Sequence, residues 1–200
     1  MGSADLSNLR FAAFLMEHVP PRYGNSAKMK AILYPFLFLA AIGLALSALV
    51  HVGAWAGLEP PSAAMGLHLG IFAVWLPAVI VSHRLARDYK QRDWWRATFR
   101  GAPRWFEKAV KVLGAYALVN FAVFLFLSAR GDGPVSKVNE FRGFSGHWMI
   151  FYAAAFSILY SAIHVEEVDR NRACLNGHQV SAVAKYCEQC GSPVVDRMRT

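Results

Sequence analysis

Long stretches of this 200-residue chain lack charge altogether. Four runs, at 31–52, 64–82, 112–129 and 148–165, contain no Asp, Glu, Lys or Arg. Charged residues make up 17% of the whole chain, whereas a typical soluble domain carries about 25%. Because about 20 apolar residues in a helix cross a bilayer, each run is long enough to span one. The sequence therefore argues against a soluble fold and predicts an all-α membrane protein with four transmembrane helices.

Other absences narrow the function. A proton-coupled pump or a voltage sensor usually carries Asp, Glu, Lys or Arg inside the membrane, and these four runs have none of these residues. The chain also lacks an HExxH motif, a Gly-x-Ser-x-Gly motif and a phosphate-binding loop. These absences favour a non-enzymatic role over a catalytic one.

Acidic residues are scarce as well, at 13 against 21 basic residues. Of the 21 basic residues, 18 lie in the N-terminal segment 1–30, in the link 84–111 between the second and third runs, or after the fourth run. Since basic loops stay in the cytoplasm, both termini and the link are predicted to be cytoplasmic. We expect a multi-pass protein of a bacterial inner membrane, with an interfacial helix in segment 1–30, a transmembrane domain at 31–165 and a tail at 172–196.

Aromatic residues are interleaved with the basic residues of link 84–111. They are Trp94, Trp95, Phe99, Trp105 and Phe106. Indole rings and long cationic side chains suit the headgroup layer of a bilayer, so the lipid bilayer is the expected partner of this link. The same mixture can bind nucleic acid by stacking and phosphate contacts. A segment tethered between two spans favours the membrane, and no nucleic acid is expected.

Glycine and other small residues mark the region of the fourth run. The segment 130–146 is glycine-rich and is predicted to form a loop, with a turn at 131–134. Three alanines at 153–155 predict the close approach of a neighbouring helix, and Ser157 and Ser161, one turn apart, are expected to be packing residues.

Cysteine is rare, and its placement is informative. The three cysteines all lie in the tail, and an odd, clustered set suits a reducing compartment and a metal better than a disulfide framework. The predicted ligands are Cys174, His178, Cys187 and Cys190. Zinc prefers four sulfur or nitrogen donors at tetrahedral corners, and two tight turns can supply a pair each. Gly177 and Gly191 are the residues expected to take up the strained backbone of those turns.

The stretch 174–194 resembles the short zinc-ribbon modules at the termini of many bacterial proteins, which commonly consist of two Cys-x2-Cys knuckles. It departs from them in the first knuckle, where His178 replaces a cysteine and one extra residue separates the ligands. The resemblance implies a structural zinc ion held by four protein ligands. Two alternatives stay open, namely a disordered basic tail and a redox-active Cys-x2-Cys pair. The membrane part resembles no family in the same way.

Histidines near the ends of the apolar runs suggest other sites. Two lie on or directly beside the second run and two on or directly beside the fourth, a spacing similar to that of the dihaem b-type membrane cytochromes. The candidate haem ligands are His68, His83, His147 and His164. A metal site of His51, His68 and His147 at the outer ends is another alternative, and ordinary interfacial histidines are the third. Haem is therefore a possible second cofactor beside zinc.

The sequence favours one function and leaves two others open. The favoured function is a non-enzymatic membrane protein that anchors a cytoplasmic zinc ribbon, which binds a protein partner. The alternatives are a b-type haem protein that transfers electrons across the membrane and a small transporter or channel subunit.

Overall fold

The computed structural model describes residues 26–87, 89–130, 136–170, 172–180 and 184–194. The interfacial helix predicted in segment 1–30 falls mostly on residues outside this set. The helices of the described part are α2 (Ser26–Trp55), α3 (Gly66–Ala86), α4 (Trp94–Thr98), α5 (Arg104–Arg130) and α6 (Lys137–Arg170). Two 3-10 helices, η1 (Ser62–Met65) and η2 (Gln91–Asp93), precede α3 and α4.

Four of these helices, α2, α3, α5 and α6, are long and apolar enough to cross a membrane. They lie where the four uncharged runs predict them, and each extends beyond its run. The longest, α6, has 34 residues, or about 51 Å of helix, so it is longer than the hydrocarbon core is thick. Pro35 and Pro77 lie inside α2 and α3, as membrane helices tolerate.

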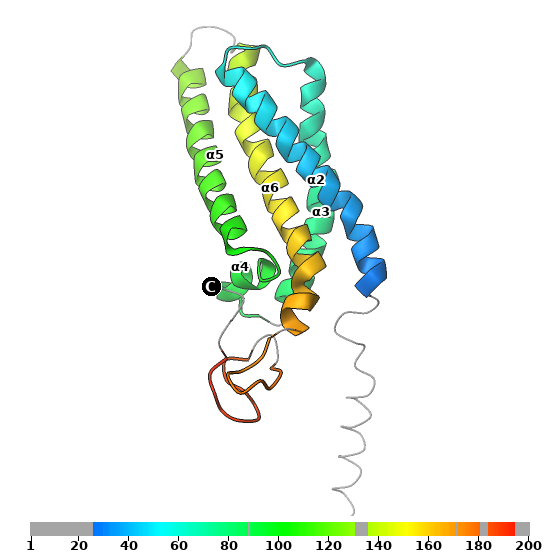
Figure 1. Cartoon of the computed structure of the whole chain (residues 1–200). Coiled ribbons are helices and arrows are strands. Elements are labelled where there is room, and N and C mark those ends of the chain that lie inside the picture. The colour runs from blue at the N-terminus through cyan, green and yellow to red at the C-terminus, as the bar shows by residue number, and fades with distance from the viewer. Residues whose placement is uncertain (1–25, 88, 131–135, 171, 181–183, 195–200) are drawn as a thin grey trace, which may run out of the picture.

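Helix α6 is the centre of the arrangement (Figure 1). It packs against α2, α3 and α5, and α2 and α3 also contact each other. In contrast, α5 packs mainly against α6, and little of its apolar surface is buried. Helix α6 therefore holds the other three together, and α5 is the most peripheral of the four.

A tyrosine of α6 fixes the packing of α2 and α3. The Tyr152 ring occupies the space beside Gly43 of α2, where an added Cβ would lie 2.2 Å from Tyr152 Cε1. Its hydroxyl lies beside Gly70 of α3 and donates a hydrogen bond to the Leu67 carbonyl oxygen at 2.8 Å. The two glycines thus let one aromatic side chain pack between three helices, as small residues do in membrane proteins.

The predicted loop at 130–146 is wrong for residues 137–146, which form the first turns of α6. Two glycines of this stretch serve helix packing. A Cβ at Gly143 would lie 2.6 Å from the Phe124 ring of α5, and one at Gly146 would lie 3.0 Å from Asn120 Nδ2. The Asn120 amide also donates to the Arg142 carbonyl oxygen at 2.8 Å. These glycines therefore allow α5 to approach α6, which explains why a glycine-rich segment is helical here.

Candidate metal centre

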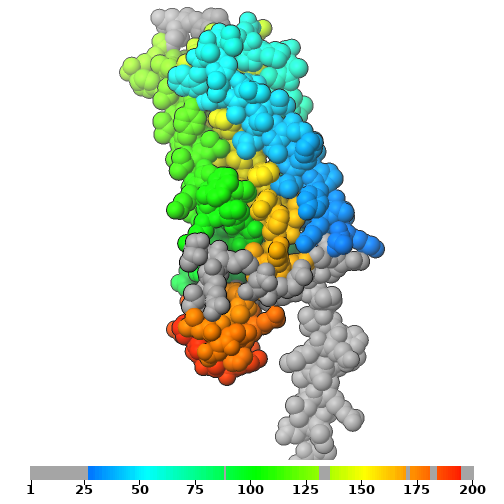
Figure 2. Space-filling view, viewed as in Figure 1, coloured from blue at the N-terminus to red at the C-terminus, as the bar shows by residue number. Residues whose placement is uncertain are grey.

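The tail begins directly beyond α6 and forms a small lobe outside the helices (Figure 2). Its first turn runs from Cys174 to His178. The Gly177 N–H donates to the Cys174 carbonyl oxygen at 3.0 Å, and the Cys174 N–H donates to the His178 carbonyl oxygen at 2.9 Å. Gly177 has a φ of 83°, in the left-handed region, where glycine has no Cβ penalty. The turn brings the two ligand residues to the same place.

The second turn, from Cys187 to Ser192, repeats this construction. The Gly191 N–H donates to the Cys187 carbonyl oxygen at 2.9 Å, and the Cys187 N–H donates to the Ser192 carbonyl oxygen at 2.8 Å. Gly191 has a φ of 68°. Single antiparallel bridges close the two turns, Ala173 with Gln179 and Tyr186 with Pro193. The predicted backbone role of both glycines is confirmed.

The structure brings the four predicted ligands together in a group that could hold a metal ion. One ligand atom from each of Cys174, His178, Cys187 and Cys190 lies within 4.8 Å of all the others. The Sγ atoms of Cys174 and Cys190 are 3.7 Å apart, and Cys187 Sγ is 3.7 Å from His178 Nδ1. Tetrahedral zinc, with bonds of about 2.3 Å to sulfur and about 2.0 Å to nitrogen, separates two sulfur donors by about 3.8 Å and a sulfur from a nitrogen donor by about 3.5 Å. The donor set and these two pair distances are compatible with zinc.

The electrostatics of one ligand, Cys190, favour a cation. Hydrogen bonds from the Ser192 side chain and backbone, followed by one from His178, lower the pKa of Cys190 to about 5. Hydrogen bonds to Cys190 and Cys187 raise the pKa of His178. Cys190 is therefore a thiolate at neutral pH, which is the form that binds metal.

Few apolar side chains stabilise the tail apart from the ligands themselves. Cys174 and Cys187 are buried, whereas Leu175 and Tyr186 beside them are exposed. The remaining contacts that are described are polar, such as the hydrogen bond from Arg172 Nη2 to the Ala184 carbonyl oxygen at 3.0 Å. A segment with so small a core needs another source of folding energy, and metal binding supplies it in modules of this size.

Family models, curated proteins and solved structures give no match to this chain. The site must therefore be interpreted from its own geometry. Within the described residues, the tail cluster is the only group of three or more His, Cys, Asp or Glu side chains placed to hold a metal ion.

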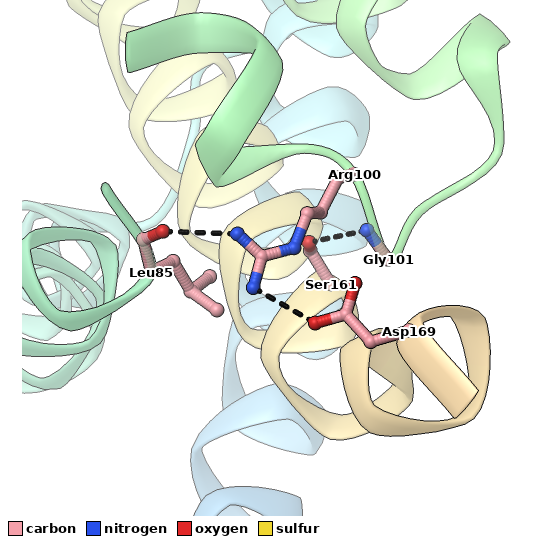
Figure 3. Close-up of polar contacts among 5 residues, drawn as sticks. All are labelled: Leu85, Arg100, Gly101, Ser161 and Asp169. Carbon is pink, nitrogen blue, oxygen red and sulfur yellow. Dashed lines mark hydrogen bonds and ion pairs between the residues drawn. The ribbon is translucent and has the colours of Figure 1, made fainter. Parts of the chain in front are cut away.

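The link between α3 and α5 fixes the end of α6 from which the tail leaves (Figure 3). Arg100 donates from Nη1 to the Leu85 carbonyl oxygen and from Nη2 to Asp169 Oδ2, both at 3.1 Å. The next residue, Gly101, donates its backbone N–H to Ser161 Oγ at 3.0 Å. Ser161, which the sequence marks as a packing residue, therefore packs against the link.

Three of the four haem candidates contact aromatic side chains. His68 Nδ1 accepts a hydrogen bond from Trp148 Nε1 at 3.1 Å, and His164 stacks on Tyr160 with ring centroids 4.1 Å apart. His147 lies against the Phe121 ring, and His83 is exposed. Haem ligation by these residues stays a prediction. His51, His68 and His147 do not form a metal-binding group among the described residues.

A polar cluster around His51 was not predicted from the sequence. His51 Nδ1 lies 2.7 Å from Ser145 Oγ, and Trp55 Nε1 donates to His51 Nε2 at 3.0 Å. Because an indole N–H only donates, Nε2 accepts, and the proton of the neutral ring is on Nδ1. His51 therefore donates to Ser145, which is the reverse of a catalytic Ser–His pair. The only signal in the sequence is the spacing of four between His51 and Trp55, which puts them on one helix face.

Proposed function

We propose that this protein is a non-enzymatic membrane protein whose helices hold a zinc-binding module at the cytoplasmic face, where the module binds a protein partner. The observation that carries this proposal is the Cys174, His178, Cys187 and Cys190 cluster at the end of α6. Four protein ligands complete the coordination of zinc and leave no open position for a substrate. Such a site is structural, so its function is to shape a surface.

The surface of the module supports a protein partner. Leu175, next to the first ligand, is 54% exposed, and Tyr186, next to the third, is 65% exposed. Both residues belong to the segment 172–194, which forms a lobe outside the four long helices (Figure 2), so burial in the hydrocarbon core does not account for their exposure. Tyrosine is enriched at protein interfaces, and exposed apolar side chains that are not lipid-facing often mark contact sites.

The proposed side of the membrane has a direct test. The excess of basic residues at 1–30, in the link and in the tail supports a cytoplasmic module. In intact cells, a membrane-impermeant maleimide should fail to label the three tail cysteines of metal-depleted protein, and it should label them after permeabilisation. Equal labelling before and after permeabilisation would place the module outside and refute the proposed orientation.

The proposed partner role can be separated from zinc binding by substitution. We expect Leu175→Ser with Tyr186→Ser to retain zinc but to lose the proteins that are cross-linked from a photoreactive residue at position 188 in living cells. Cys187→Ser with Cys190→Ser should lose both zinc and cross-links, because the surface needs the metal to form. Mass spectrometry of the cross-linked products is the measurement.

The matched control is Gln189→Ala, an exposed polar change within the same turn, which should keep both zinc and cross-links. Deletion of residues 172–200 tests whether the module is needed for partner binding at all. Partners are captured through an affinity tag on the N-terminus. If every partner of the full-length protein is still captured by the deleted form, the proposed role of the module is wrong.

A further inference from the structure

Helix α5 has a long face that no other described element covers. The helix packs mainly against α6, and apolar side chains on its other side are strongly exposed, including Val112 at 70%, Leu118 at 71% and Val119 at 64%. In a helix apolar enough to cross a membrane, such a face is the one that meets lipid.

Basic residues continue this face at the end of α5 nearest the tail. Arg104, Lys108 and Lys111 are all exposed, and their spacing of four and then three places them on one side of the helix. The same spacing continues to the exposed residues Ala115, Leu118, Ala122 and Leu125. A row of three cations, about 10 Å long at 1.5 Å per residue, therefore passes directly into an apolar row.

Aromatic side chains flank the cations. Lys111 Nζ lies 5.7 Å from the centre of the Trp95 ring of α4, and Trp95 and Trp105 are 42% and 63% exposed. Exposed indoles beside cations are typical of the headgroup layer. Among the described residues, the row has one ion pair, in which Lys111 Nζ lies 2.6 Å from Glu107 Oε1 in an exposed i, i+4 arrangement. A surface pair of this kind is weak, and two further N–H donors of the ammonium group point elsewhere.

We propose that this face of α5 binds an anionic phospholipid. Arg104, Lys108 and Lys111 hold the phosphate of the headgroup, Trp95 and Trp105 contact the glycerol region, and an acyl chain lies along Leu118 and Leu125. The argument rests on the continuity of a cationic row with an apolar row, which matches the two parts of one lipid molecule. A nucleic acid would use the cations and the indoles, but it would leave the apolar row without a role.

Native mass spectrometry of the full-length protein in a neutral detergent tests this site. The probes are phosphatidylglycerol and phosphatidylcholine with identical acyl chains. The first phosphatidylglycerol should bind at least about tenfold more tightly than phosphatidylcholine, since each of the three basic residues contributes up to about a fivefold increase in affinity for an anionic headgroup. Arg104→Gln, Lys108→Gln and Lys111→Gln together should abolish this preference, whereas Glu107→Gln should increase it.

The matched control removes three positive charges from the neighbouring segment instead. Arg84, Arg87 and Lys90 are exposed, and their triple glutamine variant should keep the tenfold preference. Equal loss in both triple variants would show that net charge alone selects the lipid and would overturn the site. The absence of a preference for phosphatidylglycerol in the unmodified protein would also overturn the site. Tight capture of a single-stranded oligonucleotide, lost in the α5 variant without any lipid preference, would identify nucleic acid as the ligand.

Discussion

Protein purified without chelators should contain one equivalent of zinc, and Cys187→Ser with Cys190→Ser should reduce this to less than about a tenth of an equivalent. The double variant removes two of the four donors, and three protein donors are the minimum that zinc sites of proteins usually retain. A serine hydroxyl is a much poorer ligand than a thiolate, so the remaining Cys174 and His178 cannot hold the ion. Elemental analysis of the purified protein is the measurement.

Loss of zinc should also unfold the tail while the membrane helices stay intact. Apparent zinc-binding energies of about 10–16 kcal/mol supply the folding energy of such modules, and the described tail has almost no other core. Limited proteolysis should therefore cut the double variant within 172–194 and spare the same stretch in the unmodified protein. Glu188→Gln, an exposed change between the two substituted cysteines, should keep both the metal and the protection.

Zinc affinity should fall as the pH falls, because protons compete with the ion for its ligands. Zinc binds thiolates and a neutral imidazole, so protons displace it as the pH falls. The hydrogen bonds from Ser192 that lower the pKa of Cys190 to about 5 shift protonation of this ligand to lower pH, whereas the raised pKa of His178 shifts protonation of that ligand to higher pH.

A metal-free protein whose tail is still resistant to protease at neutral pH would contradict the assignment of a metal centre.

The features that were predictable from the sequence are those with a dominant local cause. Long uncharged apolar runs are unfavourable in water, and in lipid they must be helical to satisfy their backbone hydrogen bonds. The four long helices therefore lie where they were expected. The ligand cluster was predictable for a similar reason, because two short turns bring their own ends together whatever the rest of the chain does. Gly177 and Gly191 have the positive φ angles that those turns require.

The features that were missed depend on partners far away in the chain. From the sequence alone, Gly143 and Gly146 look like loop residues. In the structure they belong to a helix, and their lack of a Cβ allows α5 to pack closely against it. His51 meets Ser145 across 94 residues, and a single sequence does not show which faces of two helices meet. Ser161 was expected to be a packing residue, but the sequence did not show that its partner is the link, from which it accepts a hydrogen bond. Tertiary packing decided each of these cases.

Gly101→Ala should lower the free energy of unfolding by about 2–3 kcal/mol, although it adds only one methyl group. A Cβ at this position would lie 2.1 Å from the Ser161 carbonyl oxygen and 2.8 Å from the Val165 nitrogen. Both atoms belong to the backbone of α6, so neither can rotate away, and the link must move outward. That movement would also break the Gly101 hydrogen bond to Ser161 and strain the Arg100 contact with Asp169.

The same substitution at Gly114 of α5 is the control for Gly101→Ala. A Cβ there would lie 3.6 Å from Ile150 Cδ1, an ordinary van der Waals contact, and alanine stabilises a helix interior by about 0.5–1 kcal/mol relative to glycine. Gly114→Ala should therefore leave stability unchanged or raise it, as measured by unfolding in mixed micelles of increasing denaturing detergent. If the two variants unfold at the same detergent fraction, the link does not pack against α6 as closely as the structure has it. Because Asp169 lies at the end of α6 from which the tail leaves, a displaced link should also increase protease cleavage near residue 172, even with zinc bound.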